Sequence, residues 1–238
     1  MPEATLPAGM LLDLDDTVLT YDAISGEAWR AVCQAEARHL DAEELDRVLR
    51  ETRCWYWSDP ERHRQGRLNL DATRVEVTLM GLRRLGIDDR TWAERLAHGF
   101  AARRDTAIGF FPGAEETLRE LVNRGVALVL MTNGAAAPQR AKIERFRLDR
   151  FFGAFLVEGE LGFGKPDPRV YEAGLRQLGL PPNAVWAVGD NLEWDVAGPQ
   201  RLGIRGIWHD YRQRGLPPDH TVVPDRIITS LADLLWTP

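Results

Sequence analysis

The stretch MLLDLDDTVLT at residues 10–20 decides how the rest of the chain is interpreted. A short apolar run leads directly into three acidic side chains, Asp13, Asp15 and Asp16. A continuous apolar run, as opposed to an alternating one, is typical of a strand whose sheet is covered by helices on both faces. We therefore predict a first strand over residues 9–14. Ligands of such sheets bind at the carboxyl ends of the strands, so the acidic side chains lie where a ligand is expected.

The same kind of apolar run returns three times, each time after a segment with helical spacing and a glycine. The helical segments are PGAEETLRELVNRG, PDPRVYEAGLRQLG and LEWDVAGPQRLG, and the apolar runs are VALVLMTN, VWAVGD and IRGIWHD. Regular alternation of helix and strand predicts an α/β fold, a Rossmann-like doubly wound parallel sheet with right-handed crossovers.

Residues 18–108 have a different sequence pattern. Helical patterns such as AEELDRVLRETRCWYW follow one another with almost no strand-like run, and the sheet is expected to resume near Phe111. An insertion of this size directly after the first strand predicts a second, helical lobe. The expected domains are a core of residues 1–17 and 109–238 and a helical cap of residues 18–108.

Composition limits the possible partners. The chain has 238 residues, 44% of them hydrophobic, and a net charge of −6, which argues against a protein that coats nucleic acid or binds acidic membrane by bulk charge. Cys33 and Cys54 have no paired spacing, so neither a disulfide framework nor a cysteine zinc site is expected. No targeting segment or membrane span is recognised, and we expect a cytoplasmic protein. The oligomeric state cannot be read from the sequence.

The acidic cluster suggests a metal site. In extended backbone, Asp13 and Asp15 point to the same side, whereas Asp16 does not. Carboxylates held together require a shared proton or a cation, and hard oxygen ligands suit Mg²⁺. The alternative is a solvated turn in which Asp16 or Thr17 caps a helix.

A second acidic group ends another predicted strand, where Asp190 leaves the strand and Asp195 lies on the following helix. These side chains could complete the metal site, or Asp190 and Glu193 could form a capping box.

Two further polar groups lie at a strand end and in a connecting loop. Thr132, Asn133 and Gly134 offer a hydroxyl, an amide and open backbone N–H groups to phosphate oxygens, although a plain turn would look the same. Lys165 precedes Pro166, which favours an extended loop, and a lone loop lysine is usually solvated.

The four groups occur in one order, DLDDT, TN, KPDP and GDNLEWD, and this ordered set resembles the haloacid dehalogenase superfamily over the whole chain. The insertion resembles the C1-type cap of that superfamily. The resemblance implies an aspartate nucleophile, Asp13, and an acid/base, Asp15. It implies Mg²⁺ ligation by Asp13, the backbone carbonyl of Asp15, and Asp190. It further implies phosphoryl binding by Thr132 and Lys165, with Asp195 orienting the lysine or a metal-bound water.

The resemblance also separates the reactions of the superfamily. Dehalogenases carry a non-acidic residue two positions after the nucleophile, because a halide needs no proton. An alkoxide does need one, so Asp15 favours a phosphatase that hydrolyses a small phosphorylated metabolite. A sugar-phosphate mutase uses the same four motifs and stays open as an alternative, ahead of a dehalogenase or a non-catalytic binding protein. The fourth motif looks closest to N-acylneuraminate-9-phosphatase and nucleotidase-like members.

Substrate specificity is expected in the cap. Arg62 and Arg64, in the stretch CWYWSDPERHRQGR, could contact a second anionic group of the substrate. Alternatively, the aromatic side chains of this stretch pack the core of the cap and its arginines face water. Trp29, Trp92 and His39 are interpreted as helix-packing residues, and His209 as a candidate for the pocket rim.

Overall fold

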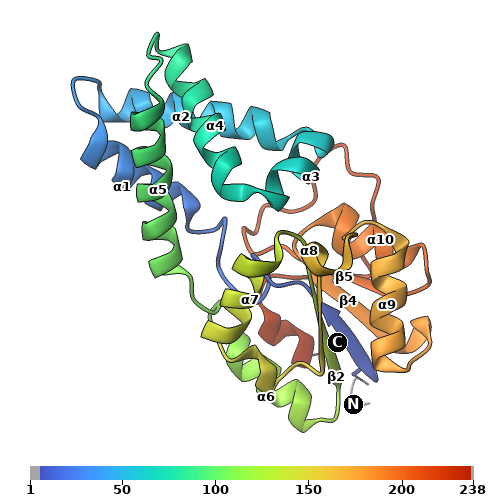
Figure 1. Ribbon diagram of the computed structural model, residues 1–238. Coiled ribbons are helices and arrows are strands. Elements are labelled where there is room, and N and C mark those ends of the chain that lie inside the picture. The colour runs from blue at the N-terminus through green and yellow to red at the C-terminus, as the bar shows by residue number, and fades with distance from the viewer. Residues whose placement is uncertain (1–5, 237–238) are drawn as a thin grey trace. The chain divides into compact units, whose positions relative to one another are not determined.

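The computed structural model describes residues 6–236 (Figure 1). By its internal contacts the chain divides into two compact units. We call Met1–Thr20 together with Gly109–Pro238 the core unit, and Tyr21–Ile108 the helical unit.

The core unit is built on a parallel sheet, as the alternating pattern predicts. Among the described residues, six strands run in the order β3-β2-β1-β4-β5-β6, and every neighbouring pair is parallel. The strands are β1 (Gly9–Leu12), β2 (Ala127–Thr132), β3 (Ala154–Val157), β4 (Val185–Gly189), β5 (Arg205–His209) and β6 (Arg226–Ile228). The first strand is shorter than expected, because the carbonyl of Leu14 accepts hydrogen bonds from the N–H groups of Val18 and Leu19 and the chain turns there.

Helices connect the strands of the core unit (Figure 1). These are α6 (Ala114–Asn123), α7 (Ala136–Arg145), η1 (Leu148–Arg150), α8 (Glu158–Leu161), α9 (Pro168–Leu178), η2 (Pro182–Ala184), η3 (Leu192–Ala197), α10 (Gly198–Gln200) and η4 (Leu231–Leu235). Two of the three predicted helices are confirmed. Helix α9 begins at the capping side chain of Asp167 and ends at Gly179, whose φ of 65° is left-handed. Its Gly174 lies so close to β1 that an added Cβ would approach Leu11 to 2.7 Å.

The third predicted helix forms only in part. Residues 192–197 make a π-helical turn, η3, and the three-residue α10 follows. The two segments are contiguous, and Ala197 and Gly198 both have helical φ and ψ angles. Pro199 has no N–H to donate, which is consistent with the irregular hydrogen-bond pattern near this position.

The two connections to the helical unit are joined within the core unit. The N–H of Thr20 donates to the carbonyl of Gly109 at 2.9 Å, and the N–H of Gly109 donates to the Thr20 hydroxyl at 3.2 Å. The N–H of Phe111 also donates to the carbonyl of Val18 at 3.1 Å. The chain therefore leaves and re-enters the core unit at one place.

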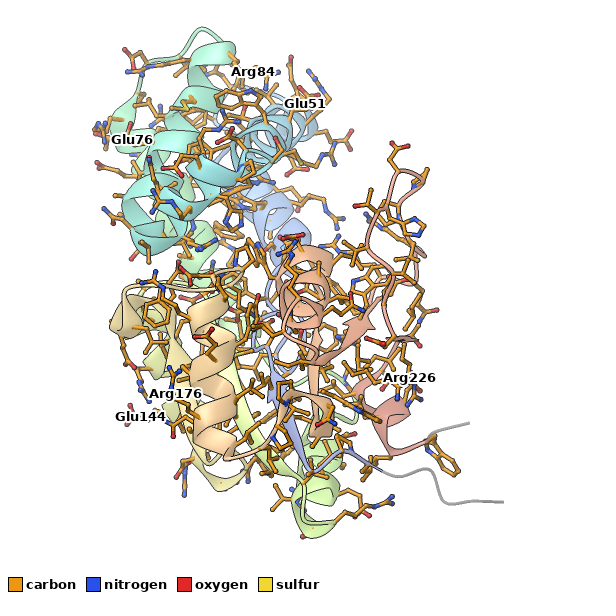
Figure 2. All side chains as sticks on the ribbon, turned by 90° about the vertical axis from the view of Figure 1, so that its right-hand side faces the viewer. Glu51, Glu76, Arg84, Glu144, Arg176 and Arg226 are labelled. Carbon is orange, nitrogen blue, oxygen red and sulfur yellow. The ribbon has the colours of Figure 1, made fainter. Side chains whose placement is uncertain are left out.

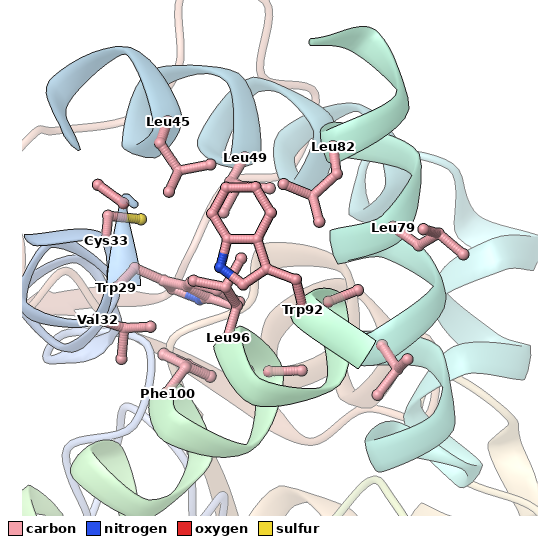
Figure 3. Packing of buried hydrophobic residues seen from close by; sticks show 14 of the residues in the cluster. Trp29, Val32, Cys33, Leu45, Leu49, Leu79, Leu82, Trp92, Leu96 and Phe100 are labelled. Carbon is pink, nitrogen blue, oxygen red and sulfur yellow. The ribbon is translucent and has the colours of Figure 1, made fainter. Parts of the chain in front are cut away.

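The helical unit consists of α1 (Ser25–Glu36), α2 (Ala42–Trp57), α3 (Pro60–Leu68), α4 (Leu70–Arg84) and α5 (Arg90–Ala107). Its core surrounds Trp92, which is fully buried and donates from its indole N–H to the carbonyl of Glu36 (Figure 3). Trp29 stacks on Phe100 with 4.3 Å between ring centroids. The packing roles predicted for Trp29 and Trp92 are confirmed.

Surface contacts also connect the helices of this unit. Arg84 of α4 binds Glu51 of α2 at 2.8 Å (Figure 2). The prediction for His39 is wrong, because this side chain is exposed in a turn after α1. Trp55 likewise does not pack into the core; it is 55% exposed at the end of α2. Cys33 and Cys54 are both free thiols, and none of the described helices is long and apolar enough to cross a membrane.

Candidate active site

Three neighbouring strands bring predicted site residues to one edge of the sheet. Asp13 directly follows β1, Thr132 is the last residue of β2, and Asp190 directly follows β4. Because β1 lies between β2 and β4 and all three are parallel, their carboxyl ends are adjacent. The Asp13 N–H donates to the carbonyl of Val188 at 3.0 Å, which fixes the backbone of Asp13 beside β4.

A buried lysine connects two of the aspartates. The Lys165 ammonium donates to Asp13 Oδ1 at 2.6 Å and to Asp195 Oδ1 at 2.7 Å, and its side chain is only 1% exposed. Lys165 is therefore not a solvated loop residue. Asp195 packs so closely on β4 that a Cβ at Gly189 would come within 2.3 Å of its carboxylate, so only glycine fits there.

Negative charge outweighs positive charge in this cluster. One ligand oxygen each of Asp13, Asp190 and Asp195 lie within 4.8 Å of one another, and Lys165 is their cationic neighbour. Burial raises the pKa of Asp13 to about 7 in spite of the attraction of Lys165. Burial and the charge of Asp13 also raise the pKa of Asp190 well above its ordinary range.

These carboxylates fit a hard divalent cation. Asp195 is already engaged, since its Oδ1 accepts from Lys165 and its Oδ2 from the Asn191 N–H. Within the described part of the chain, no hydrogen bond to the Asp190 carboxylate is found, so this side chain is open to a ligand. Oxygen donors and uncompensated charge are the properties that Mg²⁺ selects.

The capping alternatives proposed for the acidic residues are not realised. Asn191, not Asp190, caps η3 by accepting from the N–H groups of Glu193 and Trp194 at 3.0 Å. Asp16 has a φ of 59°, and the Thr17 hydroxyl donates to Asp13 Oδ2 at 3.2 Å, whereas the next helix begins only at Ser25.

The Asp15 side chain has partners that sequence reasoning missed. Lys142 donates to both of its carboxylate oxygens, at 2.6 and 2.5 Å, and the Gln139 amide donates to Oδ2 at 3.0 Å. Gln139 and Lys142 lie three positions apart on α7, hence on one face of the helix. This spacing, in a helix that follows the TN motif, is a signal that could have identified them.

The segment after β2 differs from the expected phosphate cradle. The Gly134 N–H is not open but donates to the buried Glu158 carboxylate at 2.7 Å. The Asn133 side chain is also engaged: it accepts from the N–H of Lys165 and donates to its carbonyl, both at 2.8 Å. The Thr132 hydroxyl accepts from Gln139 at 2.8 Å.

The remaining candidates make local contacts. Arg62 stacks over Trp55 at 4.1 Å and donates to the carbonyls of Trp55 and Tyr56, whereas Arg64 pairs with Glu61 at 2.6 Å. His209 does not lie at a rim. It is 1% exposed at the end of β5, and its Nδ1 lies 3.1 Å from the carbonyl oxygen of Asp16.

Comparison with known proteins agrees with this arrangement. Residues 8–203 match the family described as haloacid dehalogenase-like hydrolases. The chain belongs to this family. It is 32% identical to a phosphoserine phosphatase of Thermus thermophilus, over 94% of this chain and 96% of the relative. It is 30% identical to a glyceraldehyde 3-phosphate phosphatase of Methanopyrus kandleri, over 95% and 94% of the two chains.

Two further matches in this family bear on the fold and on the expected relatives. The HAD-hydrolase YfnB from Bacillus subtilis superimposes with a TM-score of 0.75 at 20% identity over 97% of both chains, a likeness that shows the fold. N-acylneuraminate-9-phosphatase of Rattus norvegicus is 30% identical over 63% of this chain and 60% of its own. The expected resemblance to that phosphatase is thus confirmed.

Proposed function

We propose that this protein is a Mg²⁺-dependent phosphatase that hydrolyses a small phosphomonoester through an aspartyl-phosphate intermediate. The observation that carries the proposal is the buried contact of Lys165 with Asp13, next to the open carboxylate of Asp190. A carboxylate nucleophile beside a fixed cation and a metal site is suited to phosphoryl transfer.

The metal ligands would be the carboxylates of Asp13 and Asp190 and the backbone carbonyl of Asp15. Bound Mg²⁺ would neutralise part of the negative charge that two anions bring together when a phosphate approaches a carboxylate. Asp195 holds the Lys165 ammonium beside Asp13 at the same time. Lys165 can therefore offset charge on the transferring oxygens without rearranging.

The chemistry then falls to two aspartates. A carboxylate oxygen of Asp13 forms a bond to phosphorus as the ester P–O bond breaks, and Asp15 gives its proton to the leaving alcohol oxygen. In the second half-reaction a water oxygen bonds to phosphorus, Asp15 takes the proton of that water, and the aspartyl P–O bond breaks. Asp13 and Asp15 are thereby restored, with alcohol and inorganic phosphate as products.

The relatives support a small substrate. Phosphoserine and glyceraldehyde 3-phosphate appear in the names of two relatives that cover nearly the whole chain, and both are phosphate esters of three-carbon compounds. We infer that this chain acts on a phosphorylated metabolite of similar size. The arginines Arg62 and Arg64 stay candidates for contact with its organic part.

The alternative reactions differ in what they require. A dehalogenase has no use for an acid two residues after the nucleophile, so Asp15 favours ester hydrolysis. A sugar-phosphate mutase would use the same core residues and return the phosphoryl group to the sugar. Analysis of the products from a sugar phosphate separates these two, because hydrolysis releases inorganic phosphate and a mutase yields an isomer.

The test is release of inorganic phosphate from 4-nitrophenyl phosphate and from a panel of phosphorylated metabolites. We expect activity with Mg²⁺, loss of activity with a chelator, and loss in the Asp13→Asn variant. Activity that survives Asp13→Asn removes Asp13 from the role of nucleophile. Asp149, exposed in η1, provides the matched control Asp149→Asn, which is expected to retain full activity.

A further inference from the structure

Helix α7 contributes two side chains to the surroundings of Asp15. Lys142 reaches both carboxylate oxygens of Asp15 across 127 residues of sequence. Gln139, one turn earlier and buried, donates from the same amide nitrogen to Asp15, to the Thr132 hydroxyl and to the carbonyl of Asn133.

These contacts restrict the orientation of the Asp15 carboxylate. A charge-assisted hydrogen bond is shorter and stronger than a neutral one, and two of them to a single carboxylate fix its plane as well as its position. The pair is also partly shielded from water, since the Lys142 side chain is 11% exposed and that of Asp15 is 23% exposed. An ion pair exposed to solvent would contribute little free energy. Lys142, in contrast, is held on α7, a helix that packs at the site.

The Gln139 amide is oriented by its acceptors. Its nitrogen faces three oxygens, whereas its own Oε1 is buried and has no partner within the described residues. Turning the amide around would place Oε1 against the Asp15 carboxylate and a carbonyl, so the observed orientation is the favourable one. Gln139 thus connects Asp15 to Thr132.

We propose that Lys142, assisted by Gln139, is a positioning residue for the leaving-group step: it holds the Asp15 carboxyl group where the leaving oxygen of the substrate departs. This inference rests on the proposed function. Lys142 acts through Asp15 and takes no part in bond making. Removing it therefore harms proton delivery to the leaving oxygen more than attack on phosphorus.

The dependence of kcat on the leaving group tests this positioning role of Lys142. An alkoxide needs a proton as it departs, whereas 4-nitrophenolate is stable without one. In Lys142→Met we expect kcat to fall about 10-fold to 100-fold for an alkyl phosphate such as glycerol phosphate, and less than about 3-fold for 4-nitrophenyl phosphate. KM for each substrate is expected to change less than about 2-fold. A purely structural role would lower both rates equally.

Three further variants complete the design. Lys142→Arg keeps two donors for a carboxylate and should restore most of the alkyl-phosphate activity. Arg145→Met, three positions along α7, removes the same charge from an exposed site and should leave both rates unchanged. In an Asp15→Asn background, Lys142→Met should add nothing to the leaving-group dependence.

The outcomes are distinct. Three results would overturn the inference without affecting the proposed phosphatase function. In Lys142→Met, kcat could fall equally for both substrates, or it could stay unchanged. In the Asp15→Asn background, Lys142→Met could lower kcat further. If Lys142→Met does not fold, Lys142→Gln and Lys142→Arg are compared in the same way. The inference is then overturned if these two variants have the same ratio of alkyl-phosphate to aryl-phosphate activity. A wild-type protein that hydrolyses neither ester overturns both the inference and the proposed function.

Discussion

The side-chain amide of Asn133 forms two hydrogen bonds to the backbone of Lys165, accepting from its N–H and donating to its carbonyl, both at 2.8 Å. A residue at the end of β2 thereby fixes the loop that carries the buried ammonium. The sequence predicts that Asn133 contacts substrate, whereas in the structure both polar atoms of its side chain are paired with this loop.

The first prediction follows from that contact. Asn133→Asp replaces the donating NH₂ group by a carboxylate oxygen that repels the Lys165 carbonyl. We expect the free energy of unfolding to fall by about 1–3 kcal/mol and kcat to fall because Lys165 is displaced. Denaturant unfolding and phosphate release measure the two effects. Asn183, an exposed residue of η2, serves for the control Asn183→Asp. Unchanged stability in Asn133→Asp would contradict the assignment.

A second prediction concerns Mg²⁺ and pH. Burial raises the pKa of Asp13 to about 7 in the folded protein, from an ordinary value of 3.8. Between these pH values the folded state binds more protons than the unfolded state, so the metal-free protein loses stability as the pH rises. Bound Mg²⁺ would take the place of those protons. We expect it to raise the melting temperature more at about pH 8 than at about pH 5.

The Asp190→Asn variant checks the origin of that effect. It removes one of the proposed ligands and should reduce the Mg²⁺-induced shift at the higher pH. A shift that is the same at both pH values, or that survives Asp190→Asn in full, means that Mg²⁺ binds elsewhere.

The third prediction concerns His209, which is buried at the end of β5. Burial lowers its pKa below the ordinary 6.5, in spite of hydrogen bonds to the backbone of Asp16 and Thr229. Below pH 6.5 the unfolded state binds a proton that the folded state does not, so this group lowers stability as the pH falls. The stability difference between the wild type and His209→Gln should therefore shrink from about pH 7.5 to about pH 5. Chemical unfolding of both proteins measures it, and a difference that grows instead is incompatible with a buried neutral imidazole.

The fourth prediction concerns the two thiols. Cys33 is fully buried in the core of the helical unit, and burial together with the charge of Asp46 raises its pKa to about 12. Cys54 is exposed on α2. A thiol reagent such as 5,5′-dithiobis-(2-nitrobenzoate) should modify Cys54 in the native protein and reach Cys33 only on unfolding. Cys54→Ser should abolish the fast reaction, and a fast reaction that persists in this variant would place Cys33 at the surface.

The sequence allowed the sheet, and the positions of four charged residues of the candidate site, to be predicted for a physical reason. Parallel strands covered by helices leave continuous apolar runs, and residues that follow such runs must share one edge of the sheet. Asp13 and Asp190 were placed by this rule alone. Lys165 and Asp195 required the ordered motifs as well, because a loop lysine and a helical aspartate carry no signal of burial.

What could not be predicted depends on packing between distant segments. The pairing of Asp15 with Lys142 joins the turn after β1 to α7. The spacing of Gln139 and Lys142 places both on one face of α7, but it does not specify Asp15 as their partner. His209 is buried against the carbonyl of Asp16 and the ring of Phe111, which are distant from β5 in the sequence. The change from a π-helical to an α-helical pattern before Pro199 was not predicted, because apolar periodicity does not distinguish these two kinds of helix.

The hydrogen bonds between Thr20 and Gly109 affect which insertions the core unit can accept during evolution. Since the two ends of residues 21–108 already meet, the length and identity of the intervening segment place no strain on the sheet. Closing a longer loop adds little entropic cost. Evolution, or an engineer, can therefore exchange residues 21–108 for another segment at the junction of Thr20 and Gly109, while the candidate site residues of the core unit stay unchanged.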